Sequence, residues 1–194
     1  MNWLTRPDDL MTEEEKQELI PVWITLRSEL NELERKGILN AEKKLFARRQ
    51  KDILTENFVR SVHKKMFENV WKWAGKFRTT EKNIGVAPYK ISMELKKLLD
   101  DATYWVQNMT YSPDEIAVRF HHRLVWIHPF PNGNGRHSRL MTDLLLREMG
   151  QERFSWGRGS LVEPCELRTK YIEALRSADN GNIAPLLDFV RLIS

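Results

Sequence analysis

Residues 112–150, SPDEIAVRFHHRLVWIHPFPNGNGRHSRLMTDLLLREMG, hold two segments of helical periodicity separated by a loop rich in proline and glycine. In the first segment Ser112 can cap a helix, Pro113 suits the first turn, and apolar residues recur at helical spacing. The second segment repeats that spacing until Gly150 stops it. This stretch therefore predicts two amphipathic helices joined by a loop into which neither helix can continue.

Helical spacing covers most of the remaining sequence, but the period changes between Gly75 and Ser92. The stretch KFRTTEKNIGVAPYKIS, residues 76–92, has β-branched residues around an Asn83/Gly85 turn signal, which predicts a short β-hairpin. One hairpin cannot form a sheet-based core, so we expect a mostly α fold with one short hairpin. The other expected helices cover residues 11–37, 41–49, 55–75, 93–109 and, on either side of Asn180–Gly181, 165–193.

The composition fits one medium-sized domain better than two large ones. The chain has 194 residues, of which 41% are apolar. We expect an N-terminal helical segment at residues 1–40, a candidate regulatory element, followed by the main domain at residues 41–194. The formal net charge is +4, yet positive and negative residues alternate without a basic block. No direct contact with nucleic acid is therefore expected.

Cys165 is the only cysteine, which excludes an intramolecular disulfide and a cysteine-rich zinc site. Such cysteine usage fits a reducing cytosol. The first residues lack the apolar core of a signal peptide, and no window approaches the ~18 uninterrupted apolar residues typical of a membrane span. We expect a soluble, cytoplasmic protein that makes no contact with a membrane.

The loop from His128 to Arg136 has the composition of an anion-binding site. Gly133 and Gly135 allow backbone conformations that can turn several N–H groups toward one point. The following helix begins with Arg136 and Arg139, although a helix N-terminus already carries about half a positive elementary charge. Either these arginines are solvated surface charges or a bound anion compensates for them. The loop favours the second explanation, with a polyphosphate as the anion.

His128 stands at the entry of this loop, where Pro129 would hold its imidazole near the anion. A neutral imidazole can take a proton from an incoming hydroxyl group near physiological pH. Each fragment alone has a simpler explanation, since Gly-Asn-Gly is an ordinary turn sequence and a single histidine before proline is more often structural. Together they predict attack on a phosphorus atom, with charge stabilised by amides and arginines.

The same loop resembles the signature of the Fic (Fido) family, a His-x-Phe-x-acid-Gly-Asn-Gly-Arg-x-x-Arg pattern. The stretch WKWAGKFR, residues 71–78, resembles the segment that leads to the family's flap hairpin. TLRSELNELE (residues 25–34) and HPFPNGNGRHSRL (residues 128–140) are similar to a bacterial branch called mobile mystery protein B. The residues that match the signature are His128, Phe130, Gly133, Asn134, Gly135, Arg136 and Arg139.

The resemblance implies a Fic-type helical bundle that transfers a nucleoside monophosphate to a Ser, Thr or Tyr hydroxyl group of a target protein. The usual donor is ATP with Mg²⁺, and another nucleoside triphosphate is an open alternative. By this likeness His128 is the general base, with Arg136 and Asn134 as further catalytic residues. The implied nucleotide-binding residues are Asn132, Gly133, Asn134, Gly135, Arg136 and Arg139. The implied target-binding flap consists of Ile84, Gly85 and Val86, which would pair with the target backbone.

Asn132 departs from the family pattern, which has Asp or Glu at this position to hold magnesium. An amide oxygen can coordinate a hard cation but lacks the charge of a carboxylate. Asn132 is therefore the candidate metal ligand and also the basis of an alternative function. In that alternative the chain is a catalytically weak module that binds nucleotide or a partner protein in a mobile-element or toxin–antitoxin-like system. The branch implies a small helix-turn-helix protein as a partner.

Many Fic proteins are restrained by a helix of the type Ser/Thr-x-x-x-Glu-Gly/Asn, whose glutamate pairs with the second arginine of the signature. The first part of this pattern occurs at residues 25–29 and again at residues 28–32, each followed by leucine. It predicts an inhibitory pair between Glu29 and Arg139, with Glu32 as the second choice. A solvated helix face explains the same acidic residues at least as well.

Overall fold

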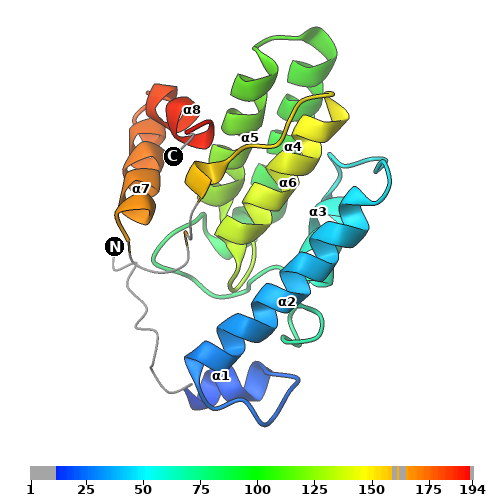
Figure 1. Ribbon diagram of the computed structural model, residues 1–194, viewed down its shortest axis with the longest axis vertical. Helices are drawn as coiled ribbons and strands as arrows, with labels where there is room; N and C mark the ends of the chain where they lie inside the picture. Colours follow the sequence, from blue (N-terminus) through cyan, green and yellow to red (C-terminus); the bar gives the residue numbers. More distant parts are fainter. Residues whose placement is uncertain (1–11, 159–160, 162–164, 193–194) are drawn as a thin grey trace.

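The computed structural model describes residues 12–158, 161 and 165–192, and this part of the chain is a bundle of α-helices (Figure 1). The mostly α fold predicted from the sequence is confirmed. Among the described helices, none combines the length and the apolar character that crossing a bilayer requires. The helices are α1 (Glu13–Glu18), α2 (Arg27–Phe46), α3 (Glu56–Phe67), α4 (Ile91–Asn108), α5 (Pro113–Ile127), α6 (Asn134–Glu148), α7 (Glu166–Asp179) and α8 (Ala184–Val190).

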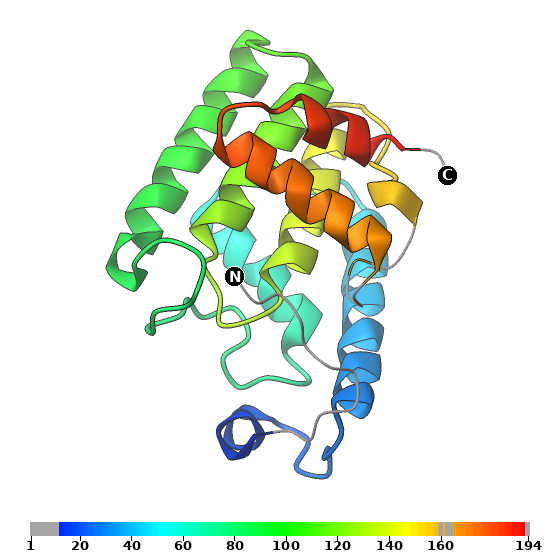
Figure 2. The same ribbon diagram turned by 90° about the vertical axis from the view of Figure 1, so that its left-hand side faces the viewer.

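Helices α5 and α6 form the centre of the bundle, and the predicted site lies in the loop that joins them. Helix α4 packs against α5, and α3 packs against α6. Helix α2 lies along α3, and α1 lies beyond the first turn of α2 (Figure 1). On another side α8 packs against α5 and against α7 (Figure 2). Phe120 and Leu124 are buried in the larger core, and Ala117 and Val118 in the smaller core. Because α5 is buried on both sides, the loop that follows it starts from a fixed point.

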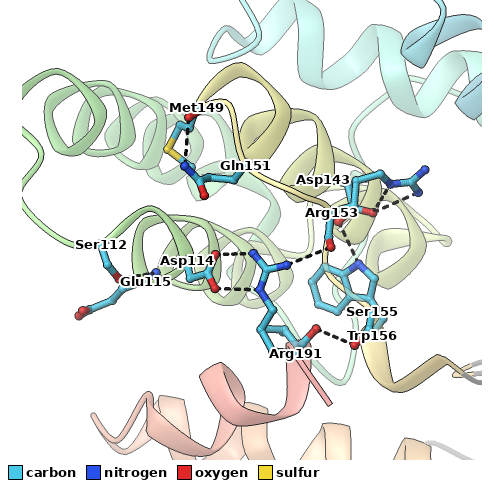
Figure 3. Close-up of polar contacts among 11 residues, drawn as sticks. Ser112, Asp114, Glu115, Asp143, Met149, Gln151, Arg153, Ser155, Trp156 and Arg191 are labelled. Atoms are coloured by element: carbon cyan, nitrogen blue, oxygen red, sulfur yellow. Dashed lines mark hydrogen bonds and ion pairs between the residues drawn. The ribbon is translucent and has the colours of Figure 1, made fainter. Parts of the chain in front are cut away.

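Polar contacts fasten the C-terminal segments to this central pair (Figure 3). Arg191, just after α8, bonds both carboxylate oxygens of Asp114 in the first turn of α5, at 2.6 and 2.8 Å. Trp156 donates its indole N–H to Asp143 of α6 at 3.1 Å, and Arg153 lies 3.3 Å from the same carboxylate. These contacts link segments far apart in the sequence, so the C-terminal segments belong to the same folded unit as α5 and α6.

Helix α2 differs from the sequence prediction, which ended one helix near Gly37 and began another at residue 41. It runs from Arg27 to Phe46 and crosses the expected boundary between residues 40 and 41. Gly37 does not end the helix because its role is close packing. A Cβ at this position would lie 2.5 Å from the carbonyl oxygen of Met66 in α3. The glycine therefore lets two helix backbones approach each other.

We expect Gly37→Ala to destabilise the protein, although alanine is ordinarily favoured over glycine inside a helix by about 1 kcal/mol. The added methyl group must push α2 away from the Met66 carbonyl, and overpacking of this kind costs about 1–3 kcal/mol. Urea unfolding of the variant and the wild type measures the change, with Asn40→Ala at an exposed position of the same helix as control. A stabilised Gly37→Ala variant would show that α2 and α3 separate without cost.

Residues 76–92 do not form the hairpin of paired strands that the sequence predicts. They form an irregular loop followed by a short 3-10 turn at Pro88–Lys90. The backbone bonds go to the loop after α5 instead of across the turn: the Arg78 N–H donates to Pro129 O at 2.9 Å, and the Val86 N–H donates to Ile127 O at 3.3 Å. We call residues 76–87 the flap.

Candidate active site

Helix α6 begins without a cap. Gly133 precedes its first residue with a φ of 77°, and as glycine it supplies no capping side chain. The first turn contains no acidic residue. The leading N–H groups, including those of Gly135 and Arg136, have no carbonyl partner within the helix. This end of α6 keeps the unpaired donors and the positive partial charge on which the predicted anion site depends.

Two of the predicted phosphate-binding groups are used inside the loop. The Gly133 N–H donates to Oδ1 of Asn132 at 2.7 Å, so it is not a free donor. The Asn134 side chain is 2% exposed; its Oδ1 accepts from the Phe130 N–H at 2.9 Å and its Nδ2 donates to Phe130 O at 2.8 Å. Contrary to the prediction, the Asn134 side chain braces the loop and is not free for a phosphate or a catalytic contact. Gly133 must be glycine, because a Cβ there would lie 2.5 Å from the Phe67 ring.

His63 of α3 is a second brace that sequence reasoning missed. Its Nδ1 accepts from the Gly75 N–H at 3.0 Å, so in the neutral ring the proton is on Nε2. Nε2 then donates to the carbonyl oxygen of Asn132 at 3.1 Å. The ring also stacks on Phe130 with the centroids 3.7 Å apart. A histidine on the apolar face of a helix has no sequence signal that separates this role from simple core packing.

His128 ends α5 in a left-handed backbone conformation, with φ 52° and ψ 60°. Burial, and after it the positive charge of the neighbouring Arg78, lower the pKa of its imidazole to about 4. Among the described residues, its buried Nδ1 makes no hydrogen bond of good geometry, and the backbone of Val125 raises the pKa by less than burial lowers it. An imidazolium would need acceptors for both of its N–H groups, so this environment favours the neutral ring. His128 therefore has the protonation state that the sequence interpretation requires of a base.

The buried histidines predict that the protein loses stability in acid. Burial lowers the pKa of His121 to about 3, of His128 and His137 to about 4, and of His63 well below its usual value. Unfolded histidines titrate near pH 6.5, so between about pH 6.5 and 4 the unfolded chain binds more protons than the folded chain. The free energy of unfolding must then fall as the pH falls. Burial raises the pKa of Asp143 to about 6, which acts in the opposite direction.

Urea unfolding between pH 7 and 4 measures this effect, and His137→Gln separates it from other acid effects. The His137 Nε2 contacts the Val59 carbonyl at 2.9 Å, a contact that a glutamine amide can imitate. We expect this variant to lose stability less steeply, by roughly 1.4 kcal/mol per pH unit for the removed proton. An unchanged slope would mean that His137 is protonated in the folded protein.

Arg136 is paired within the protein. Its Nη1 lies 2.6 Å from Oε2 of Glu34, and Oε1 of Glu34 accepts the indole N–H of Trp71 at 2.7 Å. Glu34 is 2% exposed although it is a carboxylate. The pair spans 102 residues of sequence and joins α2 to the first turn of α6. Part of the positive charge at the start of α6 is therefore neutralised by a buried glutamate that sequence reasoning did not select.

The predicted pair between Glu29 and Arg139 is wrong. The carboxylate of Glu29 accepts the backbone N–H groups of Thr25 and Leu26 at 3.1 and 3.2 Å, which caps the start of its own helix. Glu32, the second choice, pairs with Arg35 at 2.9 Å on the exposed face of α2. Glu34 lies two residues beyond Glu32, and it is this side chain that points to α6.

Arg139 lies next to Tyr171 of α7, with its guanidinium carbon 5.9 Å from the centre of the tyrosine ring. The Tyr171 hydroxyl contacts Nε2 of His121 at 2.8 Å. In the described part of the chain, no carboxylate lies within ion-pair distance of Arg139. Burial lowers the pKa of Arg139 because it disfavours the charged guanidinium, and an anion bound beside it would offset that cost. The structure therefore brings Arg136 and Arg139 to the same helix end but gives them different neighbours.

Asn132 does not fit a dedicated magnesium site. Its side-chain oxygen already accepts the Gly133 N–H, and it is exposed. Within the described residues, no three His, Cys, Asp or Glu side chains are grouped to hold a metal ion. Mg²⁺ requires a nearly octahedral set of oxygen ligands, many of them water or phosphate. One neutral oxygen from Asn132 can be no more than an auxiliary ligand.

Comparison with known proteins finds a family model that matches the part of the chain containing these features. The Fic/DOC family model matches residues 53–146, which include the flap and the loop from His128 to Arg139. Protein adenylyltransferase fic-1 of Caenorhabditis elegans is 32% identical over 124 residues, which is 60% of this chain and 22% of that protein. Protein adenylyltransferase Fic of Aedes aegypti is 28% identical over 143 residues, 72% of this chain and 27% of that protein. The chain thus spans about a quarter of the length of these curated relatives.

Solved structures share the fold. A fragment of Caenorhabditis elegans Fic-1 has a TM-score of 0.66 and 26% identity, covering 92% of this chain and 52% of that chain. The N-terminal Fic domain of a Bartonella quintana effector with bound ADP has a TM-score of 0.73 and 18% identity, covering 98% and 92%. A Bartonella tribocorum effector with bound AMPPNP has a TM-score of 0.73 and 18% identity, covering 98% and 94%.

Proposed function

Since residues 53–146 place this chain in the Fic/DOC family, we propose that it is a protein adenylyltransferase that moves AMP from ATP to a hydroxyl group of a target protein. One observation carries the proposal: the neutral imidazole of His128 stands at the entry of a loop that ends in an uncapped helix start with two arginines. The imidazole can accept a proton, and the helix start can bind phosphates. A pure nucleotide-binding module needs only the second of these groups.

In the proposed reaction the target hydroxyl oxygen attacks the α-phosphorus of ATP while its proton passes to His128. A P–O bond forms between the target and the α-phosphorus, the bond from the α-phosphorus to the bridging oxygen breaks, and pyrophosphate leaves. The N–H groups at the start of α6, with Arg136 and Arg139, stabilise the negative charge on the phosphates. The target hydroxyl belongs to Ser, Thr or Tyr in this proposal.

Magnesium enters this proposal with the nucleotide. The phosphates of ATP and water supply the oxygen ligands that Mg²⁺ prefers, and the bound ion neutralises phosphate charge. Asn132 can add one neutral oxygen. This arrangement explains how a chain with an amide at residue 132 can still use a metal-bound nucleotide.

The flap offers unpaired backbone to a target chain. In the described structure, no backbone-to-backbone hydrogen bond involves residues 79–85. Apart from the Thr80 carbonyl, which accepts from the Arg78 side chain, their N–H and C=O groups can pair with an extended segment. Ile84 and Gly85, two of the three residues assigned to target binding from the sequence, lie in this part. Val86 does not, because its N–H donates to Ile127 and its carbonyl accepts from Arg78. Val86 therefore anchors the flap, and the target pairs with the residues before it.

We further propose that Glu34 restrains the enzyme. An Arg136 held by Glu34 at 2.6 Å is a poorer ligand for the distal phosphates of ATP, because the two anions compete for one guanidinium. This moves the inhibitory role that the sequence assigned to Glu29 to a residue of the same helix. The biological setting in our proposal is a cytoplasmic enzyme of the mobile mystery protein B branch with a small helix-turn-helix partner. The stretches at residues 25–34 and 128–140 support that branch.

A labelling experiment tests the function. Purified protein is incubated with each α-labelled nucleoside triphosphate, Mg²⁺ and a cell lysate, and protein-bound label is measured. We expect label from α-labelled ATP on hydroxyl side chains, and no label from γ-labelled ATP beyond that of the lysate alone, because pyrophosphate leaves. Measurable ATP binding without protein label from any nucleotide would overturn the transferase and support the nucleotide-binding module.

A further inference from the structure

Arg78 joins the flap to the loop that carries His128. Its side chain is 3% exposed. Nε donates to the carbonyl oxygen of His128 at 2.7 Å, and Nη1 donates to that of Thr80 at 3.1 Å. Nη2 donates to Val86 O and makes a longer contact with Ile127 O at 3.5 Å. Two carbonyl groups of the flap and two at the end of α5 thus converge on one guanidinium.

The partners of Arg78 explain why a charged group can be buried here. A buried guanidinium ordinarily needs a carboxylate. In the described residues Glu81 acts on Arg78 electrostatically, but no carboxylate lies within ion-pair distance of it. The carbonyl groups of Ile127 and His128 face the guanidinium in place of a carboxylate. They belong to the end of α5, where carbonyls lack helical donors and carry the negative end of the helix dipole. The fixed fork of an arginine matches several carbonyls at once, which a lysine cannot do.

The position of His128 depends on the same contacts. A left-handed backbone is unfavourable for a residue other than glycine, costing roughly 1–2 kcal/mol. Arg78 holds the carbonyl of His128 in that conformation. On the flap, a Cβ at Gly85 would lie 2.5 Å from the Cβ of His128, so the flap backbone rests directly against this histidine. Moving the flap would therefore release or displace His128.

We propose that Arg78 is a positioning residue that couples the flap to the base, so that a target segment bound along the flap and a correctly placed His128 occur together. The kinetic consequence rests on the proposed adenylyl transfer. The structural consequence does not, since it concerns only the flap and the imidazole. A second consequence is electrostatic: after burial, the positive charge of Arg78 is the next cause of the lowered His128 pKa, followed on the flap by Lys82.

Two substitutions separate the fork of Arg78 from its charge. Arg78→Lys keeps the charge and loses the fork, whereas Arg78→Met loses both. We expect both variants to lower the labelling rate by about 10- to 100-fold through misplacement of the base, while KM for ATP changes by less than about 2-fold. Only Arg78→Met should raise the pKa of His128 and move the acidic limb of the pH–rate profile to higher pH.

Two measurements need no activity. NMR titration of the five histidines, with His128→Gln for assignment, reports the pKa of His128 in each variant. Hydrogen exchange followed by mass spectrometry reports whether the Val86 amide, which donates to Ile127, exchanges faster. We expect faster exchange in both variants and a raised His128 pKa in Arg78→Met.

The matched control is Arg119→Met in the same helix as His128. Arg119 pairs with Glu115 at 2.7 Å and lies over the Tyr111 ring, so it contacts neither the flap nor the loop. The coupling is wrong if flap exchange and the His128 pKa in the Arg78 variants match those of Arg119→Met. Should Arg78→Met fail to fold by circular dichroism, unchanged flap exchange in Arg78→Lys would alone overturn it. If the wild type binds ATP without labelling protein, the proposed transferase function is wrong. The histidine titration and the hydrogen exchange still decide whether Arg78 couples the flap to His128.

Discussion

His128→Ala is expected to lower the rate of AMP transfer to protein by about 100- to 10,000-fold, the usual contribution of a general base. ATP binding should persist, because the free N–H groups at the start of α6 and the two arginines do not involve the imidazole. Initial rates with α-labelled ATP measure the first quantity, and isothermal titration with ATP measures the second. A large loss of rate with retained affinity places His128 in the chemical step.

His122→Ala is the matched control for this result. His122 lies in the same helix, and its Nε2 contacts Oδ1 of Asp179 in α7 at 2.8 Å, away from the loop. Its replacement should leave the rate within about 2-fold of wild type, because its side chain bonds to α7 and not to the loop. If His128→Ala labels protein as fast as His122→Ala, another group removes the proton and the proposed mechanism is wrong.

The central helices and the site loop were predictable because their signals are local. Ser112 and Pro113 mark the start of α5, and the Ser112 hydroxyl does accept the Glu115 N–H at 3.3 Å. Gly133 marks the turn into α6, where its positive φ is needed. Such signals act within one helical turn, so they can be recognised in the sequence without knowledge of the fold.

Contacts between distant segments could not be predicted in the same way. The partner of Arg136 is 102 residues away, and the sequence pattern in α2 points to Glu29 and Glu32, whereas the structure uses Glu34. Which glutamate reaches Arg136 depends on how α2 packs against α3. The absence of a Cβ at Gly37 allows the two helices to pack this closely. In the sequence Gly37 predicts a helix end, because glycine is used both to end helices and to let two backbones approach each other closely.

The flap failed as a hairpin for a related reason. Its β-branched residues and its Asn83/Gly85 turn signal favour two paired strands. In the structure the donors that pairing would use, the N–H groups of Arg78 and Val86, bond to the loop after α5. Strand propensity describes what a segment favours in isolation. In the folded protein, the carbonyl groups at the end of α5 compete for the N–H donors that strand pairing would use.

Glu34→Gln is expected to raise the rate of AMP transfer and the affinity for ATP by about 10-fold each, equivalent to about 1.4 kcal/mol. In the wild type, ATP must displace the Glu34 carboxylate from Arg136 before a distal phosphate can bind there, and this competition reduces apparent affinity. Glutamine removes the charge but keeps an oxygen that can accept the Trp71 indole N–H, now 2.7 Å from Oε1. The packing of α2 is thus preserved. ATP titration measures the affinity, and labelling measures the rate.

Glu29→Gln and Glu32→Gln test whether the expected gain in rate and ATP affinity belongs to Glu34 or follows from removing any carboxylate of α2. Both residues carry the same charge in the same helix, but Glu29 caps backbone N–H groups and Glu32 pairs with Arg35. Neither control should change ATP affinity by more than about 2-fold, since exposed charges contribute little. A lower rate in Glu34→Gln would reverse the interpretation, because it would mean that the buried carboxylate holds Arg136 in the orientation that ATP needs. The sign of one substitution therefore decides whether α2 restrains this site or helps to build it.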